Sequence, residues 1–342
     1  MIKKSGWILG LLVGLSCLSL TASANAEKNE FFVQPELPTN QVKNNTSYFD
    51  LKMKSGQKQV IYIKINNGDK VRRKYDVNVN LATTSNGGNI DYTNENPEID
   101  TSLGFNIQES TSNKKKVSVA AKTSKRIPIK VEMPTGLLKG TALGGIVIKQ
   151  HVIDDKDNTK KGVVVRNQFA YSIPLQLREQ TKQTVKPTMN LLSVGPQKID
   201  NYNYITAQLQ NPRAVIMNDL KVTSYLTKAG SNKKLLKTTR KDMRMAPNSN
   251  FHFALGDGTK KLAAGKYTMH VKADSEQGKY KWNFKKNFTI TPAKAESLTK
   301  TVLEADTAET TNWWLIGSLI AAIAALASAL FWMIYRNRRA AK

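Results

Sequence analysis

The stretch VIYIKINNGDKVRRKYDVNVNL, residues 60–81, decides the fold class of this 342-residue chain. In its first half apolar side chains occupy every second position, and its second half repeats that alternation. Period-two alternation is typical of a β-strand with one buried face and one wet face. The turn residues Asn66, Asn67, Gly68 and Asp69 lie between the halves, so we predict two strands joined as an antiparallel hairpin.

The same alternation recurs along the chain and predicts a first β-sandwich domain over residues 27–180. Its later runs are Ile127, Ile129, Val131 and Met133, and then Phe169, Tyr171, Ile173, Leu175 and Leu177. Pro128 and Pro174 interrupt these runs, and because proline cannot donate to a ladder we expect edge or bulged positions there. The glycine-rich stretch 140–145 lacks the Gly-Lys-Ser/Thr ending of a phosphate loop, so we predict a tight turn or bulge.

A polar stretch over residues 181–187 predicts a linker, and a second domain is expected over residues 188–292. Its alternating apolar positions are Ile205, Ala207 and Leu209; Leu220, Val222 and Leu226; Phe251, Phe253 and Leu255; Tyr267, Met269, Val271 and Ala273; Tyr280, Trp282 and Phe284. Tyr267 begins a late strand after a glycine turn, as the tyrosine corner of immunoglobulin-like sandwiches does. We interpret Trp282 as a core residue, because large aromatic side chains dominate core burial.

The N-terminal residues 1–26 have the pattern of a secretory signal peptide: Lys3 and Lys4, an apolar stretch, and a small-residue cleavage site ending at Ala26. Lipidation at Cys17 is an alternative, but this residue lies inside the apolar stretch. Cys17 is the only cysteine, so the mature protein is expected to contain no disulfide and no thiolate metal site.

The C-terminal residues 313–335 carry no charge and are long enough to cross a bilayer as a helix. A polar stalk over residues 293–312 precedes them, and a basic tail over residues 336–342 follows. Positive residues favour the cytoplasmic side, so we expect a single-pass cell-membrane protein whose ectodomain faces the cell wall. The predicted fold class is therefore all-β: two immunoglobulin-like β-sandwich domains in tandem plus one C-terminal transmembrane α-helix.

The formal net charge of +26 predicts attraction to polyanions such as anionic wall polymers, while export argues against nucleic acid. Runs of lysine in expected turns are the candidate contacts: Lys114, Lys115, Lys116, Lys233, Lys234, Lys260 and Lys261. The alternative is that dispersed lysines only keep a β-rich surface soluble and protect strand edges.

Motifs of catalysis and of metal binding are not found in the sequence. The histidines His151, His252 and His270 stand apart, and none has a partner at the spacing of a zinc motif. The acidic stretch 154–158 lacks the glycine and the terminal glutamate of a calcium loop, so a solvated hairpin loop is favoured. We expect no enzyme activity, no cofactor and no metal, although a carboxylate pair assembled from distant positions would leave no local motif.

Several ordered segments resemble a known family. In the first domain these are Phe32–Gln41, Tyr48–Met53, Ala82–Gly87, Leu143–Ile146 and Leu175–Leu177, and in the second they are Leu209–Pro212, Met243–Phe251 and Gly265–Tyr267. They are similar to the WxL-interacting proteins of Gram-positive bacteria. The resemblance implies a first domain of peptidoglycan-binding type and a second of host-binding type. It also implies WxL-domain surface proteins, peptidoglycan and host extracellular matrix proteins as partners.

Three functions remain open from the sequence. The first is a non-catalytic surface scaffold or adhesin, which the resemblance favours. The second is an accessory subunit of a surface complex for polysaccharide binding or degradation, because β-sandwiches also bind glycans and fold alone does not decide function. The third is purely electrostatic retention at the wall through the basic surface.

Overall fold

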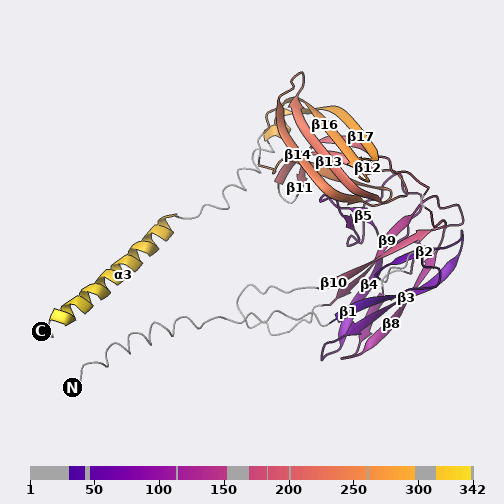
Figure 1. Cartoon of the computed structure of the whole chain (residues 1–342), viewed down its shortest axis with the longest axis horizontal. Helices are drawn as coiled ribbons and strands as arrows, with labels where there is room; N and C mark the ends of the chain where they lie inside the picture. Colours follow the sequence, from indigo (N-terminus) through magenta and orange to yellow (C-terminus); the bar gives the residue numbers. More distant parts are fainter. Residues whose placement is uncertain are drawn as a thin grey trace.

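The computed structural model describes residues 31–42, 47–112, 115–151, 169–182, 184–199, 202–259, 262–296 and 313–339. The predicted signal peptide lies outside the described residues, as do stalk residues 297–312. Figure 1 shows two β-rich bodies, formed by the first ten and the last seven strands, which adjoin near β5.

The N-terminal sandwich consists of two sheets, with strand orders β1-β3-β8 and β2-β10-β9-β4-β7, and a small β5-β6 ribbon. The strands are β1 (Phe31–Glu36), β2 (Phe49–Lys52), β3 (Lys58–Asn67), β4 (Arg73–Leu81), β5 (Thr83–Thr84), β6 (Ile90–Asp91), β7 (Lys115–Val119), β8 (Ser124–Glu132), β9 (Ala142–Gln150) and β10 (Ala170–Arg178). Apolar side chains of both sheets meet in one core, in which Ile63, Ile65 and Leu175 are completely buried. The alternation seen in the sequence is therefore the inward face of each strand.

The predicted hairpin over residues 60–81 is wrong. Both halves are strands, but β3 pairs with β1 and β8, whereas β4 pairs with β7 and β9. The turn between β3 and β4 thus crosses from one sheet to the other. Alternation indicates only which face of a strand is buried. Two successive strands show the same alternation whether they pair side by side in one sheet or lie in two sheets that pack face to face.

The predicted turn over residues 140–145 is also wrong in part, because β9 already begins at Ala142. Gly144 and Gly145 lie within this strand, between β10 and β4. A side chain at Gly144 would meet the backbone carbonyl of Asn80, and one at Gly145 would meet the ring of Tyr92. These glycines permit close approach of neighbouring groups to a central strand, a role that glycine plays inside sheets.

Both prolines occupy edge positions, as predicted. Pro128 lies on β8, which is at the edge of its sheet. Pro174 lies on β10 just before the segment that pairs with β2, which begins at Leu175. The β2–β10 pairing is held by Arg178, whose guanidinium donates to both carboxylate oxygens of buried Asp50 at 2.8 and 2.6 Å.

The C-terminal sandwich stacks a sheet of order β11-β12-β15 on one of order β14-β13-β16-β17. Its strands are β11 (Asn190–Ile199), β12 (Tyr202–Asn211), β13 (Met217–Lys228), β14 (Lys234–Met245), β15 (Ser249–Leu255), β16 (Gly265–Ser275) and β17 (Tyr280–Ile290). A second core of buried side chains fills the space between these sheets. The sequence did not predict β11 and β14, both of which are edge strands.

The tyrosine corner and the core tryptophan are confirmed. The phenol of Tyr267 donates to the carbonyl of Ala263 at 2.7 Å, and burial raises its pKa. Trp282 packs, half-buried, against the core of the C-terminal sandwich. The predicted fold class of immunoglobulin-like β-sandwiches is confirmed, while the domain boundaries stay a prediction.

The C-terminal helix α3 extends over Trp313–Arg339. Its segment Ile316–Ile334 is long and apolar enough to cross a membrane, and none of that segment is buried against the rest of the protein. A helix that is apolar on all sides and packs on nothing has the composition of a membrane span, not of a core helix.

Candidate functional site

The structure describes four of the predicted lysines and places them in two different sandwiches. Lys115 and Lys116 lie in strand β7 of the N-terminal sandwich, not in a turn, and the ammonium group of Lys115 donates to the carbonyl of Pro128. Lys233 is exposed, and Lys234 begins strand β14 of the C-terminal sandwich. Lys114, Lys260 and Lys261 lie outside the described residues. Their contact with anionic polymers stays a prediction.

A groove opens on the N-terminal sandwich between the edge strand β1 and the first half of β10. It has a volume of about 610 Å³ and is lined by Val33, Gln34, Pro35, Glu36, Ser47, Lys64, Tyr171, Ser172 and Ile173. Of these residues, Tyr171 packs on the buried Phe31 behind the lining: the ring centroids lie 4.9 Å apart, and the Tyr171 hydroxyl donates to the Phe31 carbonyl at 3.1 Å. Tyr171 thereby ties the two strands together behind the groove.

The rim of this groove offers amide, carboxylate, ammonium and hydroxyl groups. Glu36 is held by Arg126 at 2.6 Å, and the Arg126 guanidinium in turn lies 3.3 Å from the ring centroid of Tyr62. The hydrogen bond to Glu36 raises the pKa of Arg126. Such a set of donors and acceptors over an apolar floor suits a ligand that carries amides and hydroxyl groups.

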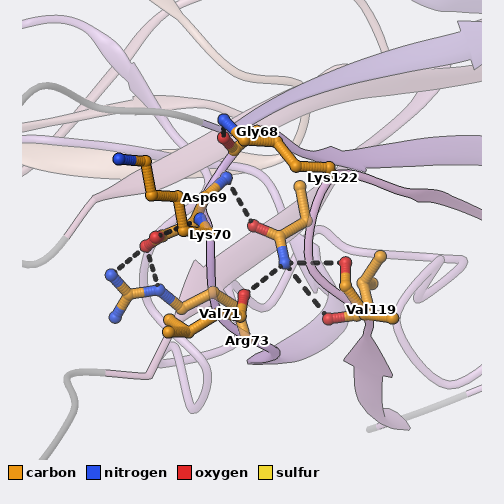
Figure 2. Close-up of polar contacts among 9 residues, drawn as sticks. Gly68, Asp69, Lys70, Val71, Arg73, Val119 and Lys122 are labelled. Carbon is orange, nitrogen blue, oxygen red and sulfur yellow. Dashed lines mark hydrogen bonds and ion pairs between the residues drawn. The ribbon is translucent and has the colours of Figure 1, made fainter.

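A second polar cluster fixes the turn that crosses between the sheets. The Asn67 amide is buried and donates to the carbonyls of Val71, Val119 and Ala120 at 2.9, 3.2 and 2.9 Å. Figure 2 shows Val71 and Val119 at this turn, together with Asp69 and Arg73. Beside it, Asp69 accepts a hydrogen bond from the Nε of Arg73 at 2.5 Å. These groups satisfy one another, so the cluster stabilises the crossing and leaves little to bind a ligand.

The two sandwiches are joined by a buried polar network around Asp100. Asp100 is 6% exposed and accepts hydrogen bonds from Gln210 at 2.8 Å and from Asn250 at 2.7 Å, both in the C-terminal sandwich. The backbone and hydroxyl of Ser102 also donate to it, at 2.9 and 2.6 Å. Burial raises the pKa of Asp100, but these hydrogen bonds outweigh burial and hold the pKa below its ordinary value.

A hydroxyl pair closes the junction at β5. The amide of Ala246 donates to the Thr84 hydroxyl at 3.0 Å, and the Ser249 hydroxyl donates to the Ala246 carbonyl at 2.8 Å. The proton of Thr84 therefore points to Ser249, 2.6 Å away. Around this pair, the buried residues Ala82, Leu143 and Ala246 form an apolar cluster that includes both sandwiches.

The loop before β6 clamps the C-terminal sandwich from outside. The Asn86 amide oxygen accepts from the backbone of His252 at 2.9 Å, and its carbonyl accepts from Arg240 at 2.8 Å. Gly88 accepts from the backbone of Arg244 at 2.8 Å and has φ of 77°. A side chain at Gly88 would overlap with Met243, so glycine is required there both for conformation and for space.

A pocket of about 440 Å³ lies beside this junction. Its lining includes Leu103, Phe105 and Leu138 from the N-terminal sandwich and Ala214, Pro247 and Asn248 from the C-terminal one. The Asn248 amide already donates to the Ser102 carbonyl at 2.8 Å. Most residues that line the pocket are thus apolar, and its Asn248 amide is occupied in holding the sandwiches together.

The histidines occupy separate environments. The Nε2 of His151 lies 2.6 Å from Asp76, His252 is on β15, and His270 stacks on Tyr225. Within the described ranges, no group of three His, Cys, Asp or Glu side chains is placed to hold a metal ion. Asp100, Thr84 and Asn86 were not predicted as site residues, because groups that meet across two domains leave no local motif of binding.

Comparisons with known proteins identify both parts of the chain. A family model described as the WxL Interacting Protein peptidoglycan binding domain matches residues 31–150. A second, described as the WxL Interacting Protein host binding domain, matches residues 160–300. The second match begins before β10, although β10 pairs within the N-terminal sandwich. A search of curated proteins finds no match.

Among solved structures, the chain is similar to pilus chaperones. One is the CsuC-CsuE chaperone-tip adhesion subunit complex of Acinetobacter baumannii, with 13% identity, a TM-score of 0.32, and 75% of this chain and 97% of that chain covered. Another is the Pseudomonas aeruginosa CupB2 chaperone, with 12% identity, a TM-score of 0.27, and coverages of 68% and 92%. Scores this low carry no argument about function.

The two family models follow one another along the chain and together span nearly all of its strands. Both describe binding domains, and neither describes a catalytic one. Their order also agrees with the order of the resembling segments in the sequence. The chain belongs to the WxL-interacting protein family and is a surface binding protein with a peptidoglycan-binding domain and a host-binding domain.

Proposed function

We propose that this chain is a non-catalytic, membrane-anchored scaffold at the cell surface that binds WxL-domain proteins and cell-wall peptidoglycan, with host proteins as further partners. The observation that carries the proposal is the tandem match to two binding domains on one chain. Helix α3 supports the anchor, because its apolar segment Ile316–Ile334 has the length of a membrane span.

The distribution of charge supports the proposed orientation of the anchor. Arg336 and Arg339 come at the C-terminal end of α3, and positive residues next to a span favour the cytoplasmic side. The sandwiches would then lie outside the membrane, where wall and partner proteins are accessible. Trp332 near the same end is suited to the headgroup level, where aromatic rings with a polar edge are enriched.

The junction supports a scaffold in a specific way. Asp100 and Asn86 of the N-terminal sandwich accept hydrogen bonds from the C-terminal one, and the Thr84 hydroxyl forms a hydrogen bond with that of Ser249. A buried, satisfied interface of this kind restricts motion between domains. Partners bound to the two domains would therefore be held at a fixed separation, as a scaffold requires.

The groove between β1 and β10 is the candidate peptidoglycan seat. It combines an apolar floor at Val33 and Ile173 with polar groups at Gln34, Glu36 and Lys64. Peptidoglycan carries amides, carboxylates and hydroxyl groups, which match that set. If this groove proves not to bind the wall, the scaffold proposal still stands and the peptidoglycan-binding site lies elsewhere.

Two functions compete with this proposal: an accessory role in polysaccharide degradation, and purely electrostatic retention at the wall. Salt separates retention from specific binding, because binding through charge alone is screened at high ionic strength, whereas burial of apolar surface persists. Degradation would release soluble products from wall or glucan substrates in proportion to protein concentration.

The test is a capture experiment with the full chain in detergent micelles. The bait is incubated with a surface extract and, separately, with purified peptidoglycan at low and high salt. We expect a WxL-domain protein to be recovered from the extract and the bait itself to sediment with peptidoglycan at both salt concentrations. Recovery of neither partner would sink the proposal, and loss of both at high salt would favour electrostatic retention.

Variants of the groove sharpen this test. Lys64→Glu with Gln34→Ala alters the rim, and we expect weaker sedimentation with peptidoglycan and unchanged recovery of the WxL-domain protein. The matched control is Lys74→Glu with Gln57→Ala, which lies outside the groove lining. Equal loss in both variants would indicate a general charge effect instead of a seat.

A further inference from the structure

The outer face of the β14-β13-β16-β17 sheet carries a two-dimensional array of lysines. On β13 and β16, Val222 and Val271 are completely buried, so the alternate residues point away from the core. Register places these outward residues in rows across the sheet: Lys221, Asp274 and Lys281; Thr223, Lys272 and Asn283; Lys237, Tyr225, His270 and Lys285. We call Lys221, Lys234, Lys237, Lys272, Lys281 and Lys285 the basic face.

Most of the charge of the basic face is not balanced by neighbours, although Asp274 lies between Lys221 and Lys281. All six lysines are exposed, and none forms an ion pair with a carboxylate of the described residues. The described carboxylates of β13, β14 and β16 are Asp219, Asp242 and Asp274, which gather toward the end where β13 begins. The rest of the face therefore presents cations alone.

A stacked aromatic pair stands in the middle of the cations. The rings of Tyr225 and His270 lie 4.4 Å apart at an interplanar angle of 6°. The ammonium group of Lys234 lies 5.0 Å from the Tyr225 centroid. Burial and the nearby charge of Lys285 lower the pKa of His270, which favours the neutral ring. The pair is a rigid ridge that offers a phenol and an imidazole next to the cations.

The chemistry of the face points to its ligand. The cations are lysines, which act as point charges for phosphate, and no arginine that would grip a carboxylate in two bonds stands in these rows. Asn283 lies between them as a hydrogen-bonding group for hydroxyls. Thr223 shares a hydrogen bond with Thr239, and the Asn287 amide oxygen accepts from Thr268, which leaves its NH2 group as a donor. Same-face residues repeat about every 6.6 Å along a strand and neighbouring strands lie about 4.8 Å apart, so the rows present their groups at regular intervals to an extended polymer that lies across the strands.

A membrane surface fits the face less well. Peripheral helices and patches that bind acidic lipid combine cations with large apolar side chains that insert between headgroups. The exposed large apolar residues of the C-terminal sandwich are Leu192 and Tyr202, on the other sheet. The basic face carries none among its described residues, so a hydroxyl-rich polyanion is the better occupant.

We propose that the basic face binds a linear wall polymer of hydroxylated units joined by phosphodiesters. The identity of the polymer rests on the proposed location at the wall, whereas the face itself does not depend on binding of a WxL-domain protein. The ligand would lie across the strands, with phosphates at the lysines and hydroxyl groups at the threonine, asparagine and tyrosine side chains.

The experiment measures binding of the full chain, in zwitterionic lipid nanodiscs, to immobilised poly(glycerol phosphate). The test variant is Lys237→Glu with Lys272→Glu and Lys285→Glu, which surrounds the aromatic pair. We expect its affinity to fall by about tenfold or more, because each lysine near a polyanion contributes separately. The control carries the same charge change at exposed positions of the N-terminal sandwich: Lys54→Glu, Lys74→Glu and Lys130→Glu. We expect the control to change affinity by less than about twofold.

Further variants and competing ligands identify the ligand and show whether a loss of binding is caused by misfolding. The variant Lys237→Arg with Lys272→Arg and Lys285→Arg keeps the charge and is expected to bind, so the conclusion does not depend on the glutamate variant alone. Equal losses in the test and control variants, or no loss in either, would overturn the proposal. Heparin bound as tightly as the phosphate polymer would overturn the phosphodiester ligand, as would tighter binding to acidic vesicles than to the polymer.

The same preparation separates this proposal from the proposed function. A chain that captures a WxL-domain protein but does not bind poly(glycerol phosphate) overturns only the basic-face ligand. A chain that binds the polymer and captures neither a WxL-domain protein nor peptidoglycan overturns only the scaffold.

Discussion

The junction between the sandwiches and the basic face use polar side chains in opposite ways. At the junction, Asp100 is buried and accepts hydrogen bonds from Ser102, Gln210 and Asn250. On the basic face, lysines are exposed and none has an ionic partner among the described residues. Satisfied buried groups specify one arrangement of the chain, whereas unpaired exposed charges remain available to a ligand. The junction therefore stabilises the arrangement of the two sandwiches, and the basic face is a candidate ligand-binding surface.

The ion pair of the N-terminal sandwich is the most deeply buried of these satisfied polar groups. Breaking it should cause the largest loss of stability. Asp50 is 0% exposed and receives two hydrogen bonds from Arg178. Asp50→Ala leaves the guanidinium buried without its partner, so we expect the free energy of unfolding to fall by about 3–5 kcal/mol. Denaturant unfolding followed by far-UV circular dichroism and tyrosine fluorescence measures it, because the N-terminal sandwich contains no tryptophan.

The control for this prediction is an exposed ion pair. Lys58 and Glu132 lie 3.0 Å apart with side chains 74% and 50% exposed. Glu132→Ala should change stability by less than about 1 kcal/mol, because exposed pairs contribute little. Similar losses in Asp50→Ala and Glu132→Ala would show that burial does not distinguish the two pairs.

Removal of the junction carboxylate is expected to have the next largest effect. Asp100→Ala leaves the amides of Gln210 and Asn250 without their acceptor, and we expect a loss of about 2–3 kcal/mol. Because these bonds connect the sandwiches, unfolding should also separate into two transitions. Differential scanning calorimetry detects this, and a single transition with an unchanged midpoint would contradict the assigned role of Asp100.

Low pH should also destabilise this junction, but by less than the Asp100→Ala substitution does. The pKa of Asp100 in the folded protein lies below the ordinary value of 3.8, so its contribution to stability is present above that value. That contribution is lost as the pH falls through the lower, folded pKa. We expect the thermal midpoint of the wild type to drop more steeply below pH 4 than that of Asp100→Asn, which cannot titrate there. Parallel pH profiles for the two proteins would refute the linkage.

Much of the fold can be predicted from alternation, but strand pairing cannot. Ile61 and Val77 alternate with polar residues as two neighbouring strands would, yet they belong to opposite sheets that share one core. Alternation identifies the buried face, and turn residues mark only where the chain reverses. Edge strands β11 and β14 escaped prediction because many of their residues are half-exposed or exposed, which weakens the period.

The candidate sites were harder to predict, for two different reasons. Asp100 and Thr84 become significant only when a second domain meets them, and no local pattern announces that. The basic face did leave a signal, since Lys281 and Lys285 alternate with the half-buried Trp282 and Phe284. Our prediction favoured runs of consecutive lysines, whereas in a strand the residues that share a face are two apart.

The smallest expected effect comes from the basic face, and it has the opposite sign. Replacement of Lys237, Lys272 and Lys285 by glutamine removes like charges that share one face of the sheet. We expect a gain in stability of about 0.5 kcal/mol at low salt, because Lys272 is diagonal to Lys285 on the neighbouring strand and like charges gathered on one face repel each other. Thermal unfolding at low and high ionic strength measures it. Salt screens the repulsion in the wild type, so the difference should disappear at about 1 M salt, where the Debye length is about 3 Å. A loss of stability in the glutamine variant at low salt would mean that these lysines support the fold, and the contrast with the junction would then fail.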